Sequence, residues 1–327
     1  MEIAKAVISH LPFDIGHFKF VFRAGVWKPR SRPDSFQGAG EQALEWLAEV
    51  KRTYGVPVAT EVATAEHVEA ALKAGIDYLW LGARTSANPI AVQEIADAIL
   101  DRCAVRPSTP VGLLIKNPVN ADAGLWIGNI ERLTQTGVPV IAVHRGCNHR
   151  PCWSMAHEVR AARPDIPMLL DPSHMSGDAT KVPELLKYVP ELGLDGAMIE
   201  VHNHPESALS DRKQQVRPED ICHLPLVIGH LSDDCKTANA ERLELNWMRA
   251  EIDELDETLW QSLAARMEVS QRIGAWKKAH GVAPLQPQRY QEISEKLKVK
   301  SEKLGLPADF IEQVWNLIHE ESLRKQE

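Results

Sequence analysis

The sequence predicts an α/β fold, a (β/α)8 barrel of parallel strands, followed by a smaller domain built only of helices. Residues 1 to about 228 alternate short β-branched runs with amphipathic stretches such as GEQALEWLAEVKRTYG, a pattern typical of parallel strands joined by helices. The expected strands are apolar without strict alternation, as strands buried on both faces are. After Gly229 the chain becomes polar and then follows helical spacing. We expect a barrel at residues 1–229, a linker at 230–240 and a helical domain at 241–327.

The expected strands are one fewer than the eight of a closed barrel. They are residues 18–24, 56–62, 78–82, 111–116, 140–144, 167–170 and 197–201. Residues 1–12 are expected to form a helix with no strand before it. Either the sequence begins inside the first strand–helix unit, or the barrel is open there.

The helical domain is expected to start with one very long helix. Residues 241–273 contain no Gly or Pro and place apolar residues close to helical spacing, which corresponds to about 50 Å of helix. Such a helix needs partner helices, which we expect to come from a second chain in a homodimer. Two shorter helices are expected at residues 288–304 and 307–324, with breaks at GVAP and GLP.

Composition excludes several classes of protein. A net charge of −8 argues against a nucleic-acid-binding protein, and no apolar run approaches the roughly 20 residues that span a membrane. The N-terminus lacks the basic start and apolar run of a signal peptide. The 5 cysteines are scattered without a CxxC pair, which indicates reduced thiols and a cytoplasmic location.

Polar side chains follow most of the expected strands, where the active site of a barrel lies. They are Arg23, Lys28, Arg30, Glu61, Arg84, Lys116, His144, Arg145, His174, Glu200 and His202. A single charged strand end is as easily structural as functional, but a series that points into one mouth indicates a shared site.

The charges at these strand ends fall into two groups. The cations form a set suited to phosphate and carboxylate, for which arginine gives bidentate contacts. His174, Glu200 and Asp211 combine nitrogen and oxygen ligands, which suits a divalent metal such as Mn, Fe, Co or Zn. The less favoured alternative for the same spacing is a set of polar residues that are hydrogen-bonded at the start of loops and bind no ligand.

Six ordered motifs, FRAGVWKPRSRP, LGARTSANP, IKNPVN, AVHRG, DPSH and IEVH–x7–SD, cover about residues 18–216. Together they resemble the DAHP synthase family, which condenses phosphoenolpyruvate with erythrose 4-phosphate. The sister family that makes the Kdo 8-phosphate sugar acid typically has KANRS where this chain has KPRS. The resemblance therefore implies the four-carbon sugar phosphate as the aldehyde.

The resemblance assigns roles to individual residues. Phosphoenolpyruvate would be held by Arg23, Lys28, Arg84, Lys116 and Arg145. Erythrose 4-phosphate would be held by Lys28, Pro29, Arg30 and Ser31, where the family usually has Thr at the last position. Lys28 and His144 would be the catalytic residues of the barrel, and His174, Glu200 and Asp211 three of four metal ligands. The fourth ligand of the family, a cysteine in a GPCS-like loop after the first strand, has no counterpart here, which leaves truncation or true absence open.

Cations also recur in the helical domain. Arg266 and Lys277 come within about 20° of each other around an ideal helix, whereas Arg249 lies about 100° away from Arg266. Cations on a helix are usually its solvated side. The segments MRAEIDELD, AARMEVSQRIGAWKK, LQPQR and HEESLRKQ nevertheless resemble the all-α class of chorismate mutase over about residues 241–326.

That resemblance implies a Claisen rearrangement of chorismate to prephenate, with no cofactor, and a homodimer whose helices interlock. The substrate carboxylates would be held by Arg249, Arg266 and Arg289, with Arg249 given by the neighbouring chain. Lys277 and Gln326 would face the ether oxygen, and Ser322 lies one turn before Gln326. Gln286 and Tyr290 replace a common Asp and a common Glu, which puts the contacts to the substrate hydroxyls in doubt.

The fusion of the two activities suggests feedback, with prephenate as the ligand that acts on the barrel. Two other interpretations stay open: the helical domain serves only regulation or dimerisation, or the barrel is inactive. Lys277 and Gln326 favour a working mutase, because a scaffold needs neither.

Overall fold

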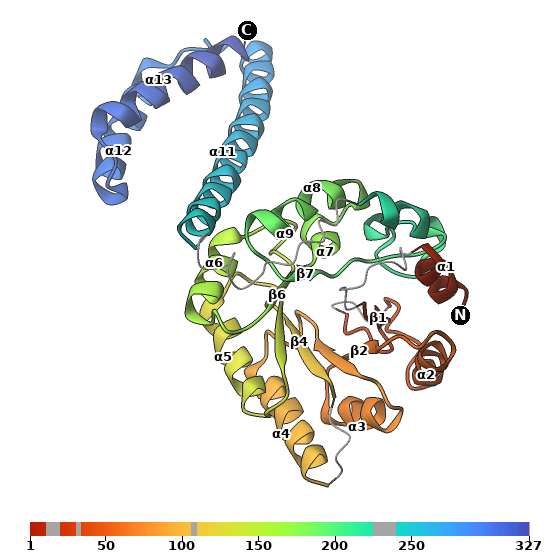
Figure 1. Cartoon of the computed structure of the whole chain (residues 1–327). Helices are drawn as coiled ribbons and strands as arrows, with labels where there is room; N and C mark the ends of the chain where they lie inside the picture. The colour runs from red at the N-terminus through yellow and green to blue at the C-terminus, as the bar shows by residue number, and fades with distance from the viewer. Residues whose placement is uncertain (11–19, 31–33, 106–109, 225–239, 327) are drawn as a thin grey trace. The chain divides into compact units, whose positions relative to one another are not determined.

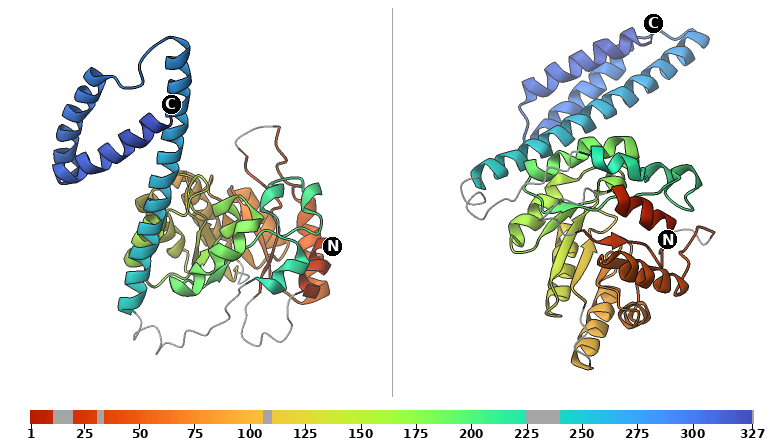
Figure 2. Two further views of the ribbon diagram at one scale, coloured as in Figure 1. Left: turned by 90° about the horizontal axis from the view of Figure 1, so that it is seen from above. Right: turned by 45° about the vertical axis from the view of Figure 1, so that its right-hand side comes forward.

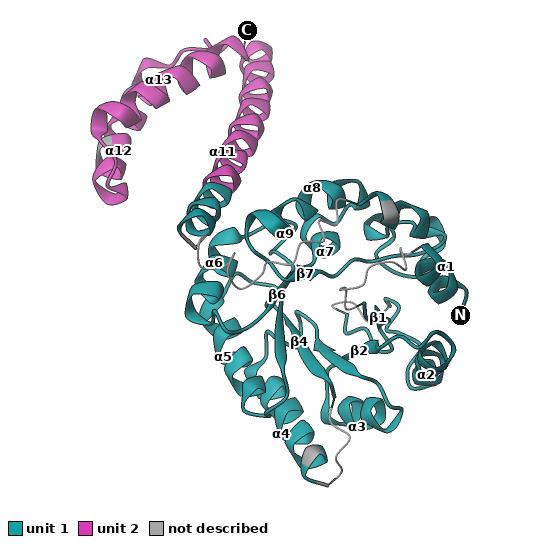
Figure 3. Cartoon of the chain, in the orientation of Figure 1, with its two compact units in different colours: residues 1–251 teal, residues 252–327 magenta. Residues whose placement is uncertain are grey.

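The computed structural model describes residues 1–10, 20–30, 34–105, 110–224 and 240–326. These residues form two compact units, residues 1–251 and residues 252–327 (Figure 3). The boundary lies inside one helix, α11 (Ala240–Ala279), so the first three turns of that helix belong to the first unit.

The first unit is built on a curled sheet of seven parallel strands in sequence order (Figure 1). The strands are β1 (Phe22–Arg23), β2 (Val58–Val62), β3 (Tyr78–Leu81), β4 (Gly112–Lys116), β5 (Val140–His144), β6 (Met168–Leu170) and β7 (Gly196–Ala197). Each pairs with the next, as Thr60 does with Leu79 and Leu114 with Ile141. The parallel strand–helix alternation is confirmed, and β5 has the bounds expected from the sequence.

The two ends of the sheet differ from expectation. Only Phe22 and Arg23 pair within the first expected strand, whose residues 18 and 19 lie outside the described residues. The last expected strand is short, and beyond it Val201 makes an isolated bridge to Val216.

Helices cover the outer side of this sheet (Figure 2). They are α1 (Glu2–His10), α2 (Gln42–Tyr54), α3 (Ala65–Lys73), α4 (Pro89–Val105), α5 (Ala123–Thr134) and α6 (Trp153–Ala162). Shorter helices follow β6 and β7: α7 (Pro172–Ser176), η1 (Ala179–Lys181), α8 (Val182–Leu186), α9 (Tyr188–Glu191), η2 (Pro205–Ser207), η3 (Arg212–Gln214) and η4 (Pro218–His223).

The core of this unit has two layers, because successive strand residues point to opposite faces. The larger layer lies between sheet and helices and takes Leu113 and Ala142 from the strands. The smaller layer lies inside the curl and takes Ala59, Leu114 and Val143. Side chains two positions apart on a strand lie on the same face. This alternation therefore decides which side chains at the strand ends point into the mouth.

The second unit contains the rest of α11 together with α12 (Pro287–Leu304) and α13 (Ala308–Arg324). The three helices expected from the sequence are therefore confirmed, with the first one longer than expected. Many of their large apolar side chains are exposed, among them Ile252 at 57 %, Leu255 at 67 % and Leu259 at 50 %. Among the described residues, no helix is long and apolar enough to cross a membrane.

Candidate active sites

Ion pairs between strand ends and loops fill the mouth of the curled sheet. Arg30 donates to both carboxylate oxygens of Asp211, at 2.9 and 3.3 Å. Arg23 forms an ion pair with Glu200 and also lies over the indole ring of Trp80, 5.1 Å from its centroid. Arg23 belongs to β1 and Glu200 follows β7, so the two ends of the sheet meet at this pair.

Asp171 is a central acid of the mouth that sequence reasoning missed. It follows β6, caps α7 by accepting a hydrogen bond from the His174 amide at 3.1 Å, and is fully buried. Lys116 pairs with its carboxylate at 2.7 Å, and the His174 ring lies 3.0 Å away. Burial alone would raise the pKa of Asp171, but His174 and Lys116 hold that pKa well below its usual value. The DPSH motif, with Pro after a capping residue, was the available signal.

Two further carboxylates are tuned by burial and charge. Burial would raise the pKa of Glu200, but Arg23 and His174 outweigh it and keep the group ionised. Gln215 donates to the second oxygen of Glu200 at 3.0 Å. Burial raises the pKa of Glu61, which lies so close to Gly82 that a side chain there would overlap its carboxylate.

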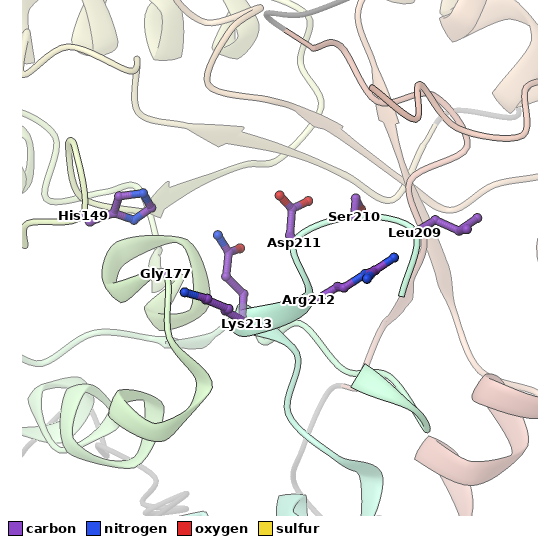
Figure 4. A pocket seen from close by; sticks show the side chains of 8 residues that line it. His149, Gly177, Leu209, Ser210, Asp211, Arg212 and Lys213 are labelled. Carbon is purple, nitrogen blue, oxygen red and sulfur yellow. The ribbon is translucent and has the colours of Figure 1, made fainter. Parts of the chain in front are cut away.

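Lys28 is the cation of the mouth best suited to move a proton. Its Nζ donates to Ser210 Oγ at 2.9 Å, and burial lowers its pKa although Glu200 and Asp211 act in the opposite direction. Ser210 and Asp211 also line a cavity of about 560 Å³ together with His149. Figure 4 shows His149 and Asp211 on opposite sides of this cavity.

The remaining expected cations lie around this mouth. Burial lowers the pKa of Arg145, whose backbone amide donates to Asn117 Oδ1 at 2.7 Å. Pro29 and His202 are partly exposed, and Arg84 is exposed. Ser31 lies outside the described residues.

His144 does not reach the mouth, which corrects its expected catalytic role. It shares its strand face with Ala142, in the layer between sheet and helices, and is 0 % exposed. Its ring lies 5.5 Å from Trp153 and 6.1 Å from Trp126, centroid to centroid. Burial lowers its pKa to about 4, so the ring is neutral at physiological pH. We therefore interpret His144 as a core residue.

The three expected metal ligands do not form a metal centre in this arrangement. Among the described residues, no group of three His, Cys, Asp or Glu side chains is placed to hold a metal ion. Glu200 and Asp211 are neutralised by Arg23 and Arg30, and His174 faces Asp171. The donor types suit a divalent metal, but the paired carboxylates do not fit one until the arginines move.

The helical unit brings four expected residues together in two pairs. Lys277 Nζ donates to Gln326 Oε1 at 2.9 Å, and Arg266 donates to Ser322 Oγ. Ser322 is only 4 % exposed, and its hydroxyl group donates a hydrogen bond to the Ile318 carbonyl oxygen at 2.7 Å. Two cations of α11 are thus each paired with a polar side chain from α13 or from the residues just after it.

Three other expected residues stand apart from these pairs. Arg289 is exposed and pairs with Glu292 at 3.0 Å, and Gln286 precedes α12 without a side-chain cap hydrogen bond. Arg249 is exposed and belongs to the first unit. Tyr290 donates to Asn316 Oδ1 at 2.8 Å.

A curled parallel sheet whose strand ends bring charged side chains into one mouth is the architecture of a barrel-type enzyme. The chain belongs to the DAHP synthetase I family, whose model matches residues 3–237. The model of chorismate mutase type II matches residues 248–327. Both family resemblances found in the sequence are therefore confirmed.

Individual relatives agree with this assignment. The phospho-2-dehydro-3-deoxyheptonate aldolase of Thermotoga maritima is 29 % identical over 220 residues, which cover 65 % of this chain and 62 % of that enzyme. A crystal structure of the same enzyme superposes with a TM-score of 0.56 and 25 % identity, covering 74 % of this chain and 65 % of that one. The 4-amino-4-deoxychorismate mutase of Streptomyces venezuelae is 31 % identical over 87 residues, or 27 % of this chain and 84 % of that enzyme. The chain spans less than two thirds of the length of the Thermotoga enzyme.

Proposed function

We propose that the barrel condenses phosphoenolpyruvate with erythrose 4-phosphate to give DAHP, and that the helical unit rearranges chorismate to prephenate. For the barrel, the proposal rests on one mouth in which Arg23 and Lys116 pair with ionised acids and Lys28 donates to Ser210. Anionic substrates would exchange places with the acids that now neutralise these cations. For the mutase, it rests on the pair formed by Lys277 and Gln326.

In the barrel reaction the enol carbon of phosphoenolpyruvate forms a bond to the aldehyde carbon. Lys28, whose lowered pKa favours proton transfer, would give a proton to the aldehyde oxygen. Bond formation leaves a cation on the adjacent carbon, which carries the phosphate ester. Water then adds to that carbon, and phosphate leaves. Glu61, with its raised pKa, is the group suited to take the proton of that water.

The helical unit needs no nucleophile, because the rearrangement only requires a fixed conformer and placed charge. The hydrogen bond from Lys277 to Gln326 Oε1 turns the amide so that its NH₂ group can donate to the substrate. Lys277 and Gln326 would then both face the ether oxygen, where negative charge develops as the C–O bond breaks. Arg266 would pair with a carboxylate.

DAHP synthases generally use a divalent metal, and His174, Glu200 and Asp211 remain our proposed ligands. A metal there would polarise the aldehyde, but binding requires Arg23 and Arg30 to release their carboxylates. The same pairs favour a second candidate function, a working mutase with an inactive barrel.

The exposed apolar side chains of the second unit support a homodimer through the helical domain. Arg249 would then act in the partner's mutase site, and prephenate bound to the dimer would inhibit the barrel. The cysteines are scattered along the sequence without a CxxC motif, which supports a cytoplasmic location.

Assays of the full chain test both activities. We expect release of phosphate from phosphoenolpyruvate only with erythrose 4-phosphate, and conversion of chorismate to prephenate. Preference for arabinose 5-phosphate would overturn the assigned aldehyde. Mutase activity without the barrel reaction would favour the second candidate.

A further inference from the structure

Two adjacent ring nitrogens in the helical unit are buried without a partner. They are Nε1 of Trp315 and Nε2 of His319, neither of which has a hydrogen-bond partner among the described residues. The two rings lie one turn apart on α13, with centroids 6.0 Å apart and planes 24° from parallel. Buried polar atoms are normally paired, so two adjacent exceptions indicate a place where a ligand completes the hydrogen bonds.

These rings border the cations assigned to the mutase site. The guanidinium of Arg266 lies 5.2 Å from the centroid of the Trp315 ring. The Trp315 ring in turn lies beside the His319 ring, and the positive charges of Arg266 and Lys277 on α11 both lower the pKa of His319. His319 therefore belongs to the same site as the pairs formed by Arg266 and Lys277.

Tyr290 does not supply the missing partner. Its ring lies 4.8 Å from that of His319, at 52°, but its hydroxyl group already donates to Asn316 on α13. Tyr290 thus holds one side of the imidazole in place by ring packing and leaves Nε2 unpaired.

His319 is neutral near physiological pH. Burial lowers its pKa, Arg266 and Lys277 on α11 lower it further, and Glu320 on its own helix opposes them. The Tyr290 ring of α12 packs against it. A neutral imidazole has one nitrogen that accepts a hydrogen bond and one that donates.

We propose that His319 is a substrate-binding residue whose Nε2 accepts a hydrogen bond from a ring hydroxyl group of the dicarboxylate held by Arg266. This inference rests on the proposed mutase function. It also names the substrate class: the ring carries a neutral hydroxyl group at this position. An ammonium group there would meet the positive field of Arg266 and Lys277, which disfavours it.

The test uses steady-state mutase kinetics of the full chain with chorismate, together with calorimetric binding of prephenate. His319→Ala should raise KM and the prephenate Kd about tenfold, the usual size for a lost hydrogen bond, with a smaller change in kcat. His319→Gln should restore most of the affinity, because its amide oxygen can accept the same bond. His280→Ala, an exposed histidine beside the end of α11, is the matched control and should resemble the parent chain.

The pH profile separates binding from a packing role. In the parent chain, kcat/KM should fall as pH drops through the lowered pKa of His319, because the protonated ring can no longer accept. That fall should be absent from His319→Gln. An unchanged KM in a folded His319→Ala, or the same acid limb in His319→Gln, would overturn the proposal.

Substrate choice gives a third measurement. We expect kcat/KM for chorismate to exceed that for 4-amino-4-deoxychorismate at least tenfold, and the ratio to shrink in His319→Ala. Equal use of both substrates by the parent chain would overturn the inference while leaving a mutase in place. Absence of any rearrangement or prephenate binding by the parent chain would instead overturn the proposed function.

Discussion

Gly274 of α11 faces the backbone of Gln326 so closely that a Cβ built at position 274 would lie 2.5 Å from the Gln326 Cα. The absence of a side chain therefore brings the end of α13 against α11, one turn before Lys277. The contact positions the amide that Lys277 holds at 2.9 Å.

Gly274→Ala should lower mutase kcat by at least about tenfold. Alanine would favour the helix by about 1 kcal/mol, but its methyl group meets backbone atoms that cannot rotate away. The control is Gly124→Ala on α5, where the nearest atom to a new Cβ is 3.6 Å away. Unchanged mutase kinetics in Gly274→Ala would show that Gln326 does not act from this position.

Replacing Lys277 with Ala should lower mutase kcat by about 10²–10³-fold, as loss of a placed donor does elsewhere. Lys278→Ala, one residue further and exposed, should be silent. The barrel reaction, measured in the same samples, should not change. An unchanged mutase rate in Lys277→Ala would contradict the role proposed for Lys277 at the ether oxygen.

Metal analysis tests the ion pairs of the barrel mouth. If Arg23 and Arg30 keep their carboxylates, the purified chain should hold well below one divalent ion and bind added Mn²⁺ weakly. Arg30→Ala should strengthen Mn²⁺ binding by releasing Asp211, and a further His174→Ala change should abolish the gain. Tight stoichiometric binding by the parent chain would contradict the paired arrangement.

His157 on α6 gives the first unit a stability that depends on pH. Its ring nitrogens lie 2.7 Å from Glu251 and 3.1 Å from Glu244, both on the first turns of α11, and the ring stacks on Trp247 at 5.4 Å. Burial lowers its pKa, but hydrogen bonds to Glu244 and Glu251 outweigh this and leave the pKa raised above 6.5.

A raised folded-state pKa contributes stability that is fully present below about pH 6.5 and is lost as pH rises through the folded value. The melting temperature of the parent chain relative to His157→Gln should therefore be highest near pH 6 and should decline toward pH 9. A difference that does not vary with pH would show that the imidazole is not charged in this contact. Thermal denaturation followed by circular dichroism provides the measurement.

The exposed apolar residues of α11 predict a dimer. Leu255 and Leu259 lie one turn apart and are 67 % and 50 % exposed. Changing both to Glu should give monomers in analytical ultracentrifugation, whereas Gln261→Glu should not. A parent chain that sediments as a monomer would contradict both the proposed dimer and the proposed action of Arg249 in the partner's mutase site.

The elements were predictable because burial and helical spacing are local properties of the sequence. The run Val140–His144 became a strand with those bounds. The direction of its side chains was not predictable, because a strand that is apolar on both faces shows no alternation of polar and apolar residues. His144 was therefore expected in the mouth, although it lies on the face that packs against the helices. Asp171 was missed because its importance comes from Lys116 and His174, which only the fold brings to it.

Because helix α11 belongs to both units, it restricts how either unit could be replaced by the corresponding unit of another protein. Trp247 and Ala250, each 3 % exposed, are core residues of the first unit, while Arg266 and Lys277 of the same helix lie in the second unit. A graft made at residues 230–240 would take core residues from the barrel, and a graft at residue 251 would cut a continuous helix. A functional chimera therefore has to keep this helix in register and replace the residues facing each module separately.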